Sequence, residues 1–173
     1  MSLFTEKNYN SDDGMITSIW GPPLWHSLHT ISFNYPIKPT KEQKQDYYNF
    51  YNSLKNILPC RFCRDNLKNN LKELPLTLDV MESRKTLSKW VYDLHEHINK
   101  MLGKKSNLSY NMVRERYEQF RSRCLVKKPV KKIETGCVEP LYGIKSKCIL
   151  NIVPKTSHKN TFKIDPKCKI KKL

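Results

Sequence analysis

The sequence predicts an all-α domain followed by a basic extension that lacks a helical pattern. Apolar residues recur at helical spacing in five segments before residue 124, and helix-capping residues flank several of these segments. After Cys124 the composition changes to lysine, proline and short β-branched runs. A chain of 173 residues is long enough for one ordinary domain and an appendage without a disulfide framework. We therefore expect the six cysteines to serve chemistry more than scaffolding.

The first two predicted helices span Pro22–Tyr35 and Lys41–Ile57. Proline is tolerated in the first turn of a helix, so Pro22 suits the start of the first one. Thr40 and Gln43 form a capping-box pattern at the start of the second. The apolar stripes are Leu24, Leu28, Ile31 and Tyr35 in the first helix and Tyr47, Phe50, Tyr51, Leu54, Ile57 and Leu58 in the second.

Three further helices are predicted downstream. One begins at position 59 or 60 and ends before Pro75, and the next runs from about Ser83 to Gly103, where the glycine is a C-cap candidate. The last spans Ser109–Arg123. The inward-facing residues are Leu87, Trp90, Val91, Leu94, Ile98, Met101 and Leu102 in the fourth helix and Met112, Val113, Tyr117 and Phe120 in the fifth.

We place the helical domain at residues 15–124 and the extension at residues 125–173. The extension holds 13 lysines and 3 acidic residues, which makes +10 of the net charge of +16. A basic extension can bind nucleic acid, an anionic surface or an acidic partner, but solvated lysine runs that bind nothing in particular are as common. Its β-branched runs CILNIV and TFKI indicate a linker with a small strand pair, or no regular structure.

The chain carries no sign of a membrane span or a secretory leader. It has no run of eighteen apolar residues, and its first residues, MSLFTEKNYNSDDG, lack the basic and then apolar order of a signal peptide. We therefore expect an intracellular, soluble chain. In a reducing compartment a CxxC motif is usually metal-binding or catalytic, since structural disulfides do not persist there.

The CxxC motif lies in LPCRFCRDNL, between a proline and the start of a helix. A structural zinc site would need four ligands, and no second CxxC or suitably spaced histidine pair accompanies Cys60 and Cys63. A redox dithiol needs only these two sulfurs. The helix N-terminus and the neighbouring Arg61 and Arg64 would lower a thiol pKa. We favour a reactive disulfide and keep zinc as the alternative.

Histidine and aromatic residues recur on two of the predicted helices. Trp25 and His29 share one helix face at i, i+4, and so do His95 and Asn99. Such pairs are more often core packing than cofactor contacts. Two helices that each bring a histidine toward one apolar interior, beside a CxxC, would nevertheless suit a planar polar ligand.

Three ordered motifs, WGPPLWHSLHTISFNYP, PCRFC and WVYDLHEHINKMLGKK, lie within residues 19–124. Together they resemble the Erv/ALR family of FAD-linked sulfhydryl oxidases, most of all members from large DNA viruses of the mimivirus kind, which would place the chain in host cytoplasm or virion. The resemblance implies a four-helix bundle with a short fifth helix, usually a homodimer. It also implies that the bundle encloses FAD with its isoalloxazine against the CxxC.

The same resemblance implies roles for individual residues. A protein dithiol, such as that of a thioredoxin-like carrier, would attack Cys60, and Cys63 would face the flavin, which passes the electrons to oxygen and yields hydrogen peroxide. A cation at Lys104 would offset the pyrophosphate charge. The implied FAD contacts are Trp20, Gly21, Trp25, His29, His95, Ile98, Asn99, Leu102, Lys104 and Tyr117.

The chain departs from the family pattern at several positions. Glu96 replaces an asparagine of the family motif. Tyr92, with Ser109 or Tyr110, stands where many members have a structural disulfide, so we expect FAD and dimer contacts to hold that end of the bundle. A second, shuttle cysteine pair could come only from Cys124, Cys137, Cys148 and Cys168, which could equally be an extension disulfide or free thiols. The alternative function is a zinc-containing, basic module that binds nucleic acid or a protein partner.

Overall fold

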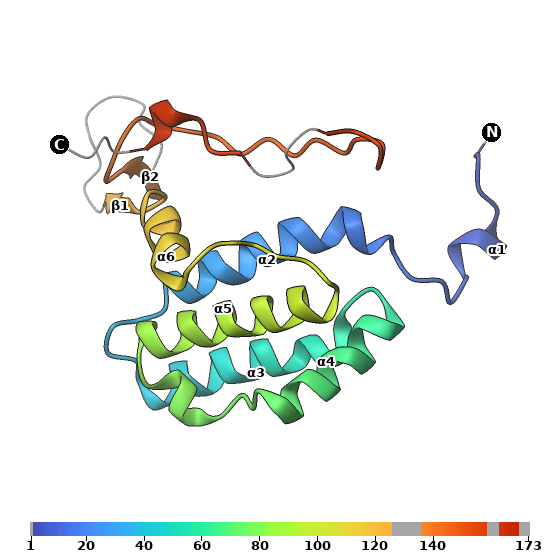
Figure 1. The fold of residues 1–173 in the computed structure, drawn as a ribbon, viewed down its shortest axis with the longest axis horizontal. Helices are drawn as coiled ribbons and strands as arrows, with labels where there is room; N and C mark the ends of the chain where they lie inside the picture. The colour runs from blue at the N-terminus through green and yellow to red at the C-terminus, as the bar shows by residue number, and fades with distance from the viewer. Residues whose placement is uncertain (1, 126–135, 159–162, 170–173) are drawn as a thin grey trace.

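The computed structural model describes residues 2–125, 136–158 and 163–169 (Figure 1). The described part is mostly helical, which confirms the predicted fold class. Its helices are α1 Glu6–Tyr9, α2 Thr17–Phe33, α3 Lys41–Ile57, α4 Arg61–Glu73, the 3-10 helix η1 Leu78–Glu82, α5 Arg84–Met101, α6 Tyr110–Glu118 and the 3-10 helix η2 Pro166–Cys168. Its strands are β1 Ser122–Leu125 and β2 Gly136–Pro140.

Four long helices form the bundle. α2 packs on α5, α3 packs on α4, α4 also touches α5, and α6 crosses the end of α2 and α5 (Figure 1). α1 lies apart from the bundle. Burying an aliphatic or aromatic side chain stabilises the fold by about 1.5–3 kcal/mol, so the core accounts for much of the stability. Its buried members are Leu28, Tyr35, Tyr51, Leu54, Leu67, Met81, Leu87, Trp90, Val91 and Leu94.

The helix ends predicted from capping residues agree with the structure. α3 spans Lys41–Ile57 as predicted, because the Thr40 hydroxyl accepts a hydrogen bond from the Gln43 backbone N–H and the Gln43 side-chain oxygen accepts one from the Thr40 backbone N–H. Ser83 caps α5, and Gly103 follows that helix at φ +67°, a conformation that favours glycine. α4 starts at Arg61 with Cys60 as its N-cap.

The first helix begins five residues earlier than predicted. α2 starts at Thr17, so Pro22 and Pro23 lie inside the helix and not in its first turn. These prolines cannot donate to the carbonyls of Ser18 and Ile19. Both residues are exposed, so water can pair with their carbonyls, and the helix continues through the prolines. The early start brings the first turn of α2 beside the CxxC motif.

The last predicted helix ends too late, and the strand pair lies elsewhere than predicted. α6 spans only Tyr110–Glu118, after which β1 pairs antiparallel with β2. Arg121 ends the helical path, since its guanidinium donates to the Phe33 carbonyl and its own carbonyl accepts from the Leu141 N–H. CILNIV contains no strand, and the first half of TFKI lies outside the described residues. The expected domain boundary after residue 124 falls inside β1.

The end of the bundle without the family disulfide is held by tyrosines. The Tyr92 hydroxyl donates to the Leu108 carbonyl at 2.8 Å, and the Tyr110 hydroxyl lies 2.9 Å from that of Ser88. The rings of Tyr92 and Tyr110 also meet edge to face, 5.8 Å apart. These contacts tie α5 to α6 and to the loop before it, so the chain itself supplies part of what the family disulfide supplies; the expected contribution of FAD and dimer contacts stays a prediction.

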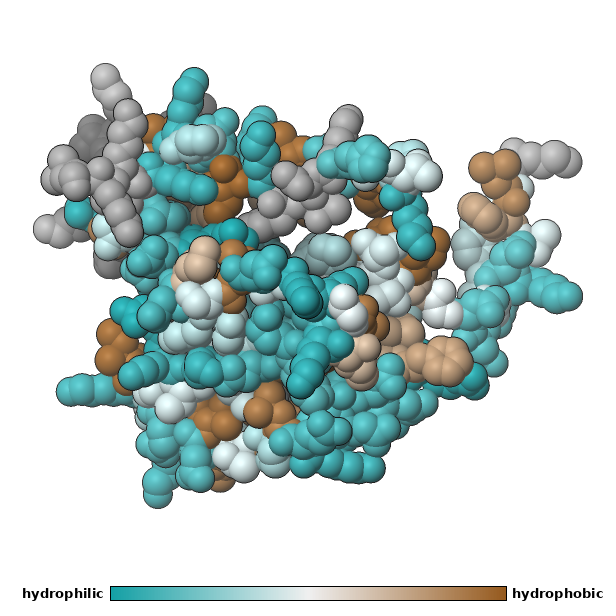
Figure 2. Space-filling view, in the orientation of Figure 1, coloured by the Kyte–Doolittle hydropathy of each residue, from teal (hydrophilic) through white to brown (hydrophobic). Residues whose placement is uncertain are grey.

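The surface in view is largely hydrophilic, with hydrophobic residues in separate patches (Figure 2). Within the described ranges, no helix is both long enough and apolar enough to cross a bilayer.

Candidate active site

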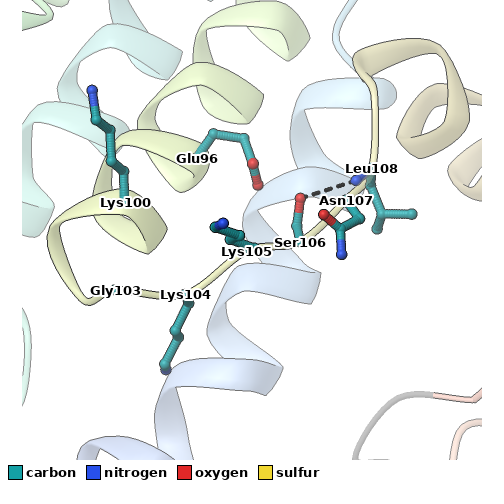
Figure 3. A pocket seen from close by; sticks show the side chains of 8 residues that line it. All are labelled: Glu96, Lys100, Gly103, Lys104, Lys105, Ser106, Asn107 and Leu108. Atoms are coloured by element: carbon teal, nitrogen blue, oxygen red, sulfur yellow. Dashed lines mark hydrogen bonds between the residues drawn. The ribbon is translucent and has the colours of Figure 1, made fainter.

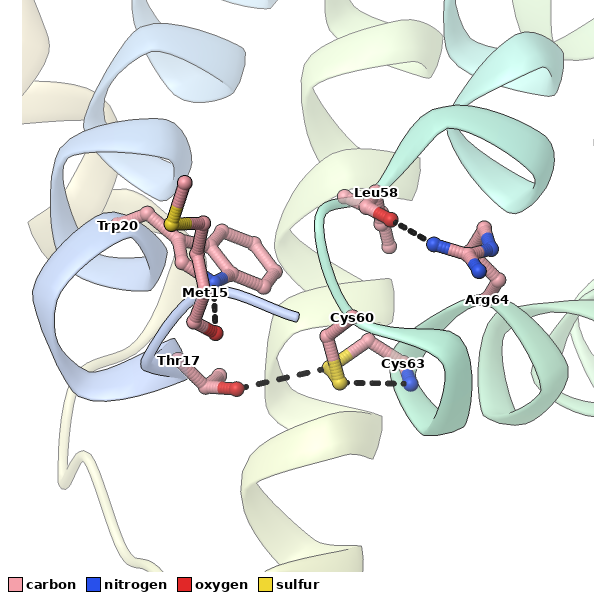
Figure 4. Close-up of a disulfide and its surroundings, with 7 residues drawn as sticks. All are labelled: Met15, Thr17, Trp20, Leu58, Cys60, Cys63 and Arg64. Carbon is pink, nitrogen blue, oxygen red and sulfur yellow. Dashed lines mark hydrogen bonds between the residues drawn. A yellow bond between two sulfur atoms is a disulfide. The ribbon is translucent and has the colours of Figure 1, made fainter. Parts of the chain in front are cut away.

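A disulfide joins Cys60 and Cys63 at the N-terminus of α4 (Figure 4). The Cys60 sulfur caps this helix by accepting from the Cys63 backbone N–H at 3.2 Å. The Cα atoms are 5.2 Å apart, a separation that suits a disulfide. Both cysteines are half-buried. The structure thus brings together the two sulfurs that the sequence predicts to be catalytic.

Arginine and backbone contacts shape the loop that carries the disulfide. The Arg64 guanidinium donates to the Leu58 carbonyl at 2.6 Å and so fixes the loop from within α4 (Figure 4). The Arg61 guanidinium lies 5.2 Å from the centre of the Phe62 ring. The positive end of the α4 dipole and these guanidinium groups favour negative charge on the sulfurs.

The first turn of α2 lies against the disulfide, which sequence reasoning missed. The Met15 N–H donates to the Pro59 carbonyl at 2.8 Å, and the Trp20 indole donates to the Met15 carbonyl at 3.0 Å (Figure 4). The Thr17 hydroxyl lies 3.7 Å from the Cys63 sulfur. Trp20, predicted to contact a cofactor, is thereby tied to the segment beside the CxxC.

An aromatic and histidine cluster fills the space between α2, α5 and α6. Trp25 stacks on His95 with ring centres 3.9 Å apart and planes 4° from parallel. His29 contacts His95 through a 3.0 Å hydrogen bond between Nε2 and Nδ1, and Tyr117 stacks on His29 at 5.3 Å. The structure therefore brings four of the predicted site residues into one cluster.

Two further members of this cluster were not predicted. His26 lies 3.3 Å from the Tyr117 hydroxyl, and Phe33 stacks on the Tyr117 ring at 5.2 Å. Both positions share the α2 face of His29, at i−3 and i+4. That spacing was a usable signal, but it describes ordinary core packing equally well.

Burial keeps the central histidines neutral. Desolvation, with the charge of His95, lowers the pKa of His29 to about 3. Desolvation also lowers the pKa of His95 to about 4, and Glu96 partly opposes it. Because each neutral imidazole has one donor and one acceptor, one of the pair donates in the shared hydrogen bond. The buried Nδ1 of His29 has no hydrogen-bond partner among the described residues, so a bound polar group could satisfy it.

A basic pocket of about 520 Å³ lies between the end of α5 and the following loop (Figure 3). Lys100, Lys104 and Lys105 line it together with Glu96. The Asn99 side-chain amide donates to the Glu96 carboxylate at 3.0 Å. The pocket therefore suits an anionic group, although the Glu96 carboxylate reduces its positive charge.

The other predicted contacts are spread around this region. Gly21 is buried, and a Cβ atom there would meet only Thr17 within 4 Å, at 3.8 Å. Ile98 packs against the core, whereas Leu102 is 55% exposed at the end of α5. Lys104 lines the basic pocket.

The cysteines of the extension fall into different states. Cys137 is disulfide-bonded, whereas Cys148 and Cys168 are free. The side chain of Cys124 lies outside the described part. Across the ranges that the structure describes, no group of three or more histidine, cysteine or acidic side chains is placed to hold a metal ion.

Comparison with known proteins gives a consistent result. The model of the Erv1/Alr family matches residues 22–118. A probable FAD-linked sulfhydryl oxidase of Acanthamoeba polyphaga mimivirus is 44% identical over 86 residues, or 50% of this chain and 60% of that protein. The FAD-linked sulfhydryl oxidase of Arabidopsis thaliana is 36% identical over 84 residues, or 49% of this chain and 42% of that protein. The chain thus spans about half the length of these relatives.

Solved structures show the same fold. The yeast Erv1 core superposes with a TM-score of 0.54 and 26% identity, over 68% of this chain and 96% of that one. The FAD-binding domain of Erv1 from Saccharomyces cerevisiae gives 0.54 and 29% identity, over 60% and 94%. Because the family model covers more than half of the residues, including the CxxC and both histidine helices, this chain belongs to the Erv1/Alr family.

Proposed function

We propose that this protein is an FAD-dependent thiol oxidase that forms disulfides in substrate proteins and reduces oxygen to hydrogen peroxide. One observation carries the proposal: the Cys60–Cys63 disulfide caps α4 directly beside α2, the helix that also carries the histidine and aromatic cluster. Family membership and the names of the relatives support the same activity.

The cysteine pair would accept two electrons from a substrate dithiol. A substrate thiolate attacks the Cys60 sulfur, the bond to Cys63 breaks, and Cys63 leaves as a thiolate with the electron pair. The second substrate thiolate then attacks the mixed disulfide and releases Cys60. Thr17 lies 3.7 Å from the Cys63 sulfur, so the proposed leaving sulfur is the one that faces α2.

The residues between the disulfide and the lysines fit FAD. Aromatic side chains offer flat faces for a ring system, the buried His29 Nδ1 needs a polar partner, and lysines suit a pyrophosphate. When bound, FAD supplies a two-electron acceptor that oxygen can reoxidise. The residues that would hold it are Trp20, Gly21, Trp25, His29, His95, Ile98, Asn99, Leu102, Lys104 and Tyr117.

Glu96 would weaken cofactor binding relative to the family asparagine. Its carboxylate shares the pocket with the lysines and would repel a pyrophosphate, although it also holds the Asn99 amide in place. Glu96→Gln keeps an acceptor for Asn99 and removes the charge. We expect this variant to bind FAD more tightly.

The partners follow from the same proposal. The substrate would be a protein dithiol, for example that of a thioredoxin-like carrier, and two copies of the chain would form a homodimer. The setting would be intracellular, in host cytoplasm or virion as for a viral family member. The extension would act as an electrostatic tether to an acidic partner, and the candidates for a shuttle would be Cys124, Cys137, Cys148 and Cys168.

Expression with abundant riboflavin tests the function. The purified protein should be yellow, contain about one FAD per chain and consume oxygen when given dithiothreitol. Cys63→Ser should keep the flavin spectrum and lose oxygen consumption, whereas Cys148→Ser should keep both. Folded protein without flavin and without oxygen consumption would contradict the proposal, and stoichiometric zinc would favour the alternative of a zinc module.

A further inference from the structure

A short segment that leads into α2, and includes its first residue, is fixed against the CxxC loop. This segment, Gly14–Thr17, we call the strap. Its Met15 N–H donates to the Pro59 carbonyl at 2.8 Å, and the Met15 carbonyl accepts from the Trp20 indole at 3.0 Å. The strap is thus held from both sides, by the CxxC loop and by α2, so the residues next to Met15 have defined positions.

Glycine at position 14 permits this close approach. A Cβ atom at Gly14 would lie 3.0 Å from the Pro59 carbonyl oxygen and 3.3 Å from the Cys60 Cα. Both distances are shorter than ordinary van der Waals contacts, and both partners are backbone atoms that cannot rotate away. A larger residue would push the strap from the loop that carries the disulfide.

The strap brings one hydroxyl to the second sulfur of the pair. The Thr17 Oγ1 lies 3.7 Å from the Cys63 Sγ, a distance within reach of a hydrogen bond to sulfur (Figure 4). A disulfide sulfur is a weak acceptor, but a thiolate carries a full charge and accepts strongly. The Thr17 hydrogen can rotate toward whichever form is present.

The charged side chains near the Cys63 sulfur make their contacts elsewhere. Arg64 bonds to the Leu58 carbonyl, and Arg61 lies on the Phe62 ring. Asp12 and Asp13 precede the strap and are exposed. A donor from α2 therefore adds to the stabilisation that α4 itself provides.

We infer that Thr17 donates a hydrogen bond to the Cys63 thiolate once the disulfide is reduced, and that Gly14 and Met15 position it for this role. This inference deepens the proposed function, in which Cys63 is the leaving sulfur that faces the flavin. The hydrogen bond stabilises the reduced pair. It therefore makes the disulfide easier for a substrate to reduce and keeps Cys63 in its electron-donating form.

The thiolate fraction of Cys63 tests the inference directly. In a Cys60→Ser background, the rate at which iodoacetamide alkylates Cys63 is followed across pH and resolved by mass spectrometry. Thr17→Val should lower the thiolate fraction at neutral pH about threefold to tenfold, because the 3.7 Å contact is long and a hydrogen bond of this length contributes less than a short one to a charged group. Thr17→Ser should restore it.

A matched control comes from the same helix. Thr30→Val removes a hydroxyl that donates to the His26 carbonyl at 2.8 Å, away from the disulfide, and should leave the alkylation profile unchanged. A Thr17→Val profile identical to that of its parent would overturn the inference. Thr17→Ser keeps the hydroxyl and loses the methyl group, whereas Thr17→Val keeps the shape and loses the hydroxyl. Comparing the two variants therefore distinguishes loss of the hydroxyl from a change in packing.

Redox equilibrium with glutathione gives a second measurement that needs no turnover. In the full chain, Thr17→Val should shift the equilibrium of Cys60–Cys63 toward the disulfide by about threefold to tenfold. Gly14→Ala should shift it in the same direction, and no shift would refute the role of the strap. Oxygen consumption plays no part here, so failure of the oxidase proposal and failure of this inference are distinguishable.

Discussion

The helical bundle buries apolar side chains, whereas the C-terminal extension exposes them. Every buried residue in the described part lies between Gly21 and Val113, and the described residues of the extension include no buried one. Ile149, Leu150 and Ile152 of the extension are 66%, 67% and 75% exposed. The free energy of folding therefore comes from the bundle, where the candidate active site also lies.

The two regions are joined by polar contacts more than by apolar burial. β2 of the extension pairs antiparallel with β1, and the Leu141 N–H donates to the Arg121 carbonyl at 2.8 Å. Hydrogen bonds of this kind contribute about 0.5–1.5 kcal/mol each. Because so little apolar surface joins the two regions, substitutions in the extension should leave the bundle and its site intact.

Truncating a core side chain should have the largest effect on stability. Leu87 is 0% exposed at the centre of the bundle, and Leu87→Ala should lower the free energy of unfolding by about 2–5 kcal/mol, because it leaves a cavity. Ile149→Ala in the extension should change it by less than about 0.5 kcal/mol. Urea unfolding of both variants measures the difference, and equal losses would show that the extension belongs to the core.

Acidification should destabilise the bundle through its histidines. Burial lowers the pKa of His29 to about 3 and of His95 to about 4, from 6.5 in the unfolded chain. The unfolded chain therefore binds more protons below pH 6.5, so this stability is complete above pH 6.5 and is lost as pH falls toward 3. Each histidine contributes a slope of up to about 1.4 kcal/mol per pH unit.

Urea unfolding between pH 7 and pH 4 checks this dependence. His29→Gln should reduce the slope of the free energy of unfolding against pH by the contribution of one proton, about 1.4 kcal/mol per pH unit, whatever its effect on stability at pH 7. Leu87→Ala, which lowers stability without removing a titratable group, is the control and should leave the slope unchanged. If the slope is the same in both variants, buried histidines are not its source.

The sequence predicts the bundle better than the contacts around the disulfide. α3 was predictable to the residue because a capping box and an amphipathic stripe agree at its start. The start of α2 was not, because prolines at positions 22 and 23 normally mark a first turn. Thr17 belongs to no motif, and its contact with Cys63 depends on how two distant segments pack, which periodicity does not describe.

Removing the hydrogen bond between Tyr92 and Leu108 should have a smaller effect on stability. Tyr92→Phe deletes the hydrogen bond to the Leu108 carbonyl and should lower the free energy of unfolding by about 1 kcal/mol, seen as a fall of a few degrees in Tm. Tyr142→Phe, in the extension, should change it by less than about 0.5 kcal/mol. An unchanged Tm for Tyr92→Phe would mean that the Tyr110 contacts alone hold this end.

Replacing the free cysteines of the extension should have the smallest effect. Cys148 and Cys168 are outside the bundle, so the double variant Cys148→Ser, Cys168→Ser should keep its flavin and its oxygen consumption with dithiothreitol, a small dithiol that reaches Cys60 without help. With a protein dithiol as substrate, the same variant separates two roles of the extension. A loss of turnover restricted to the protein substrate would identify these sulfurs as a shuttle, whereas a loss with dithiothreitol would show that the extension is coupled to the active site after all.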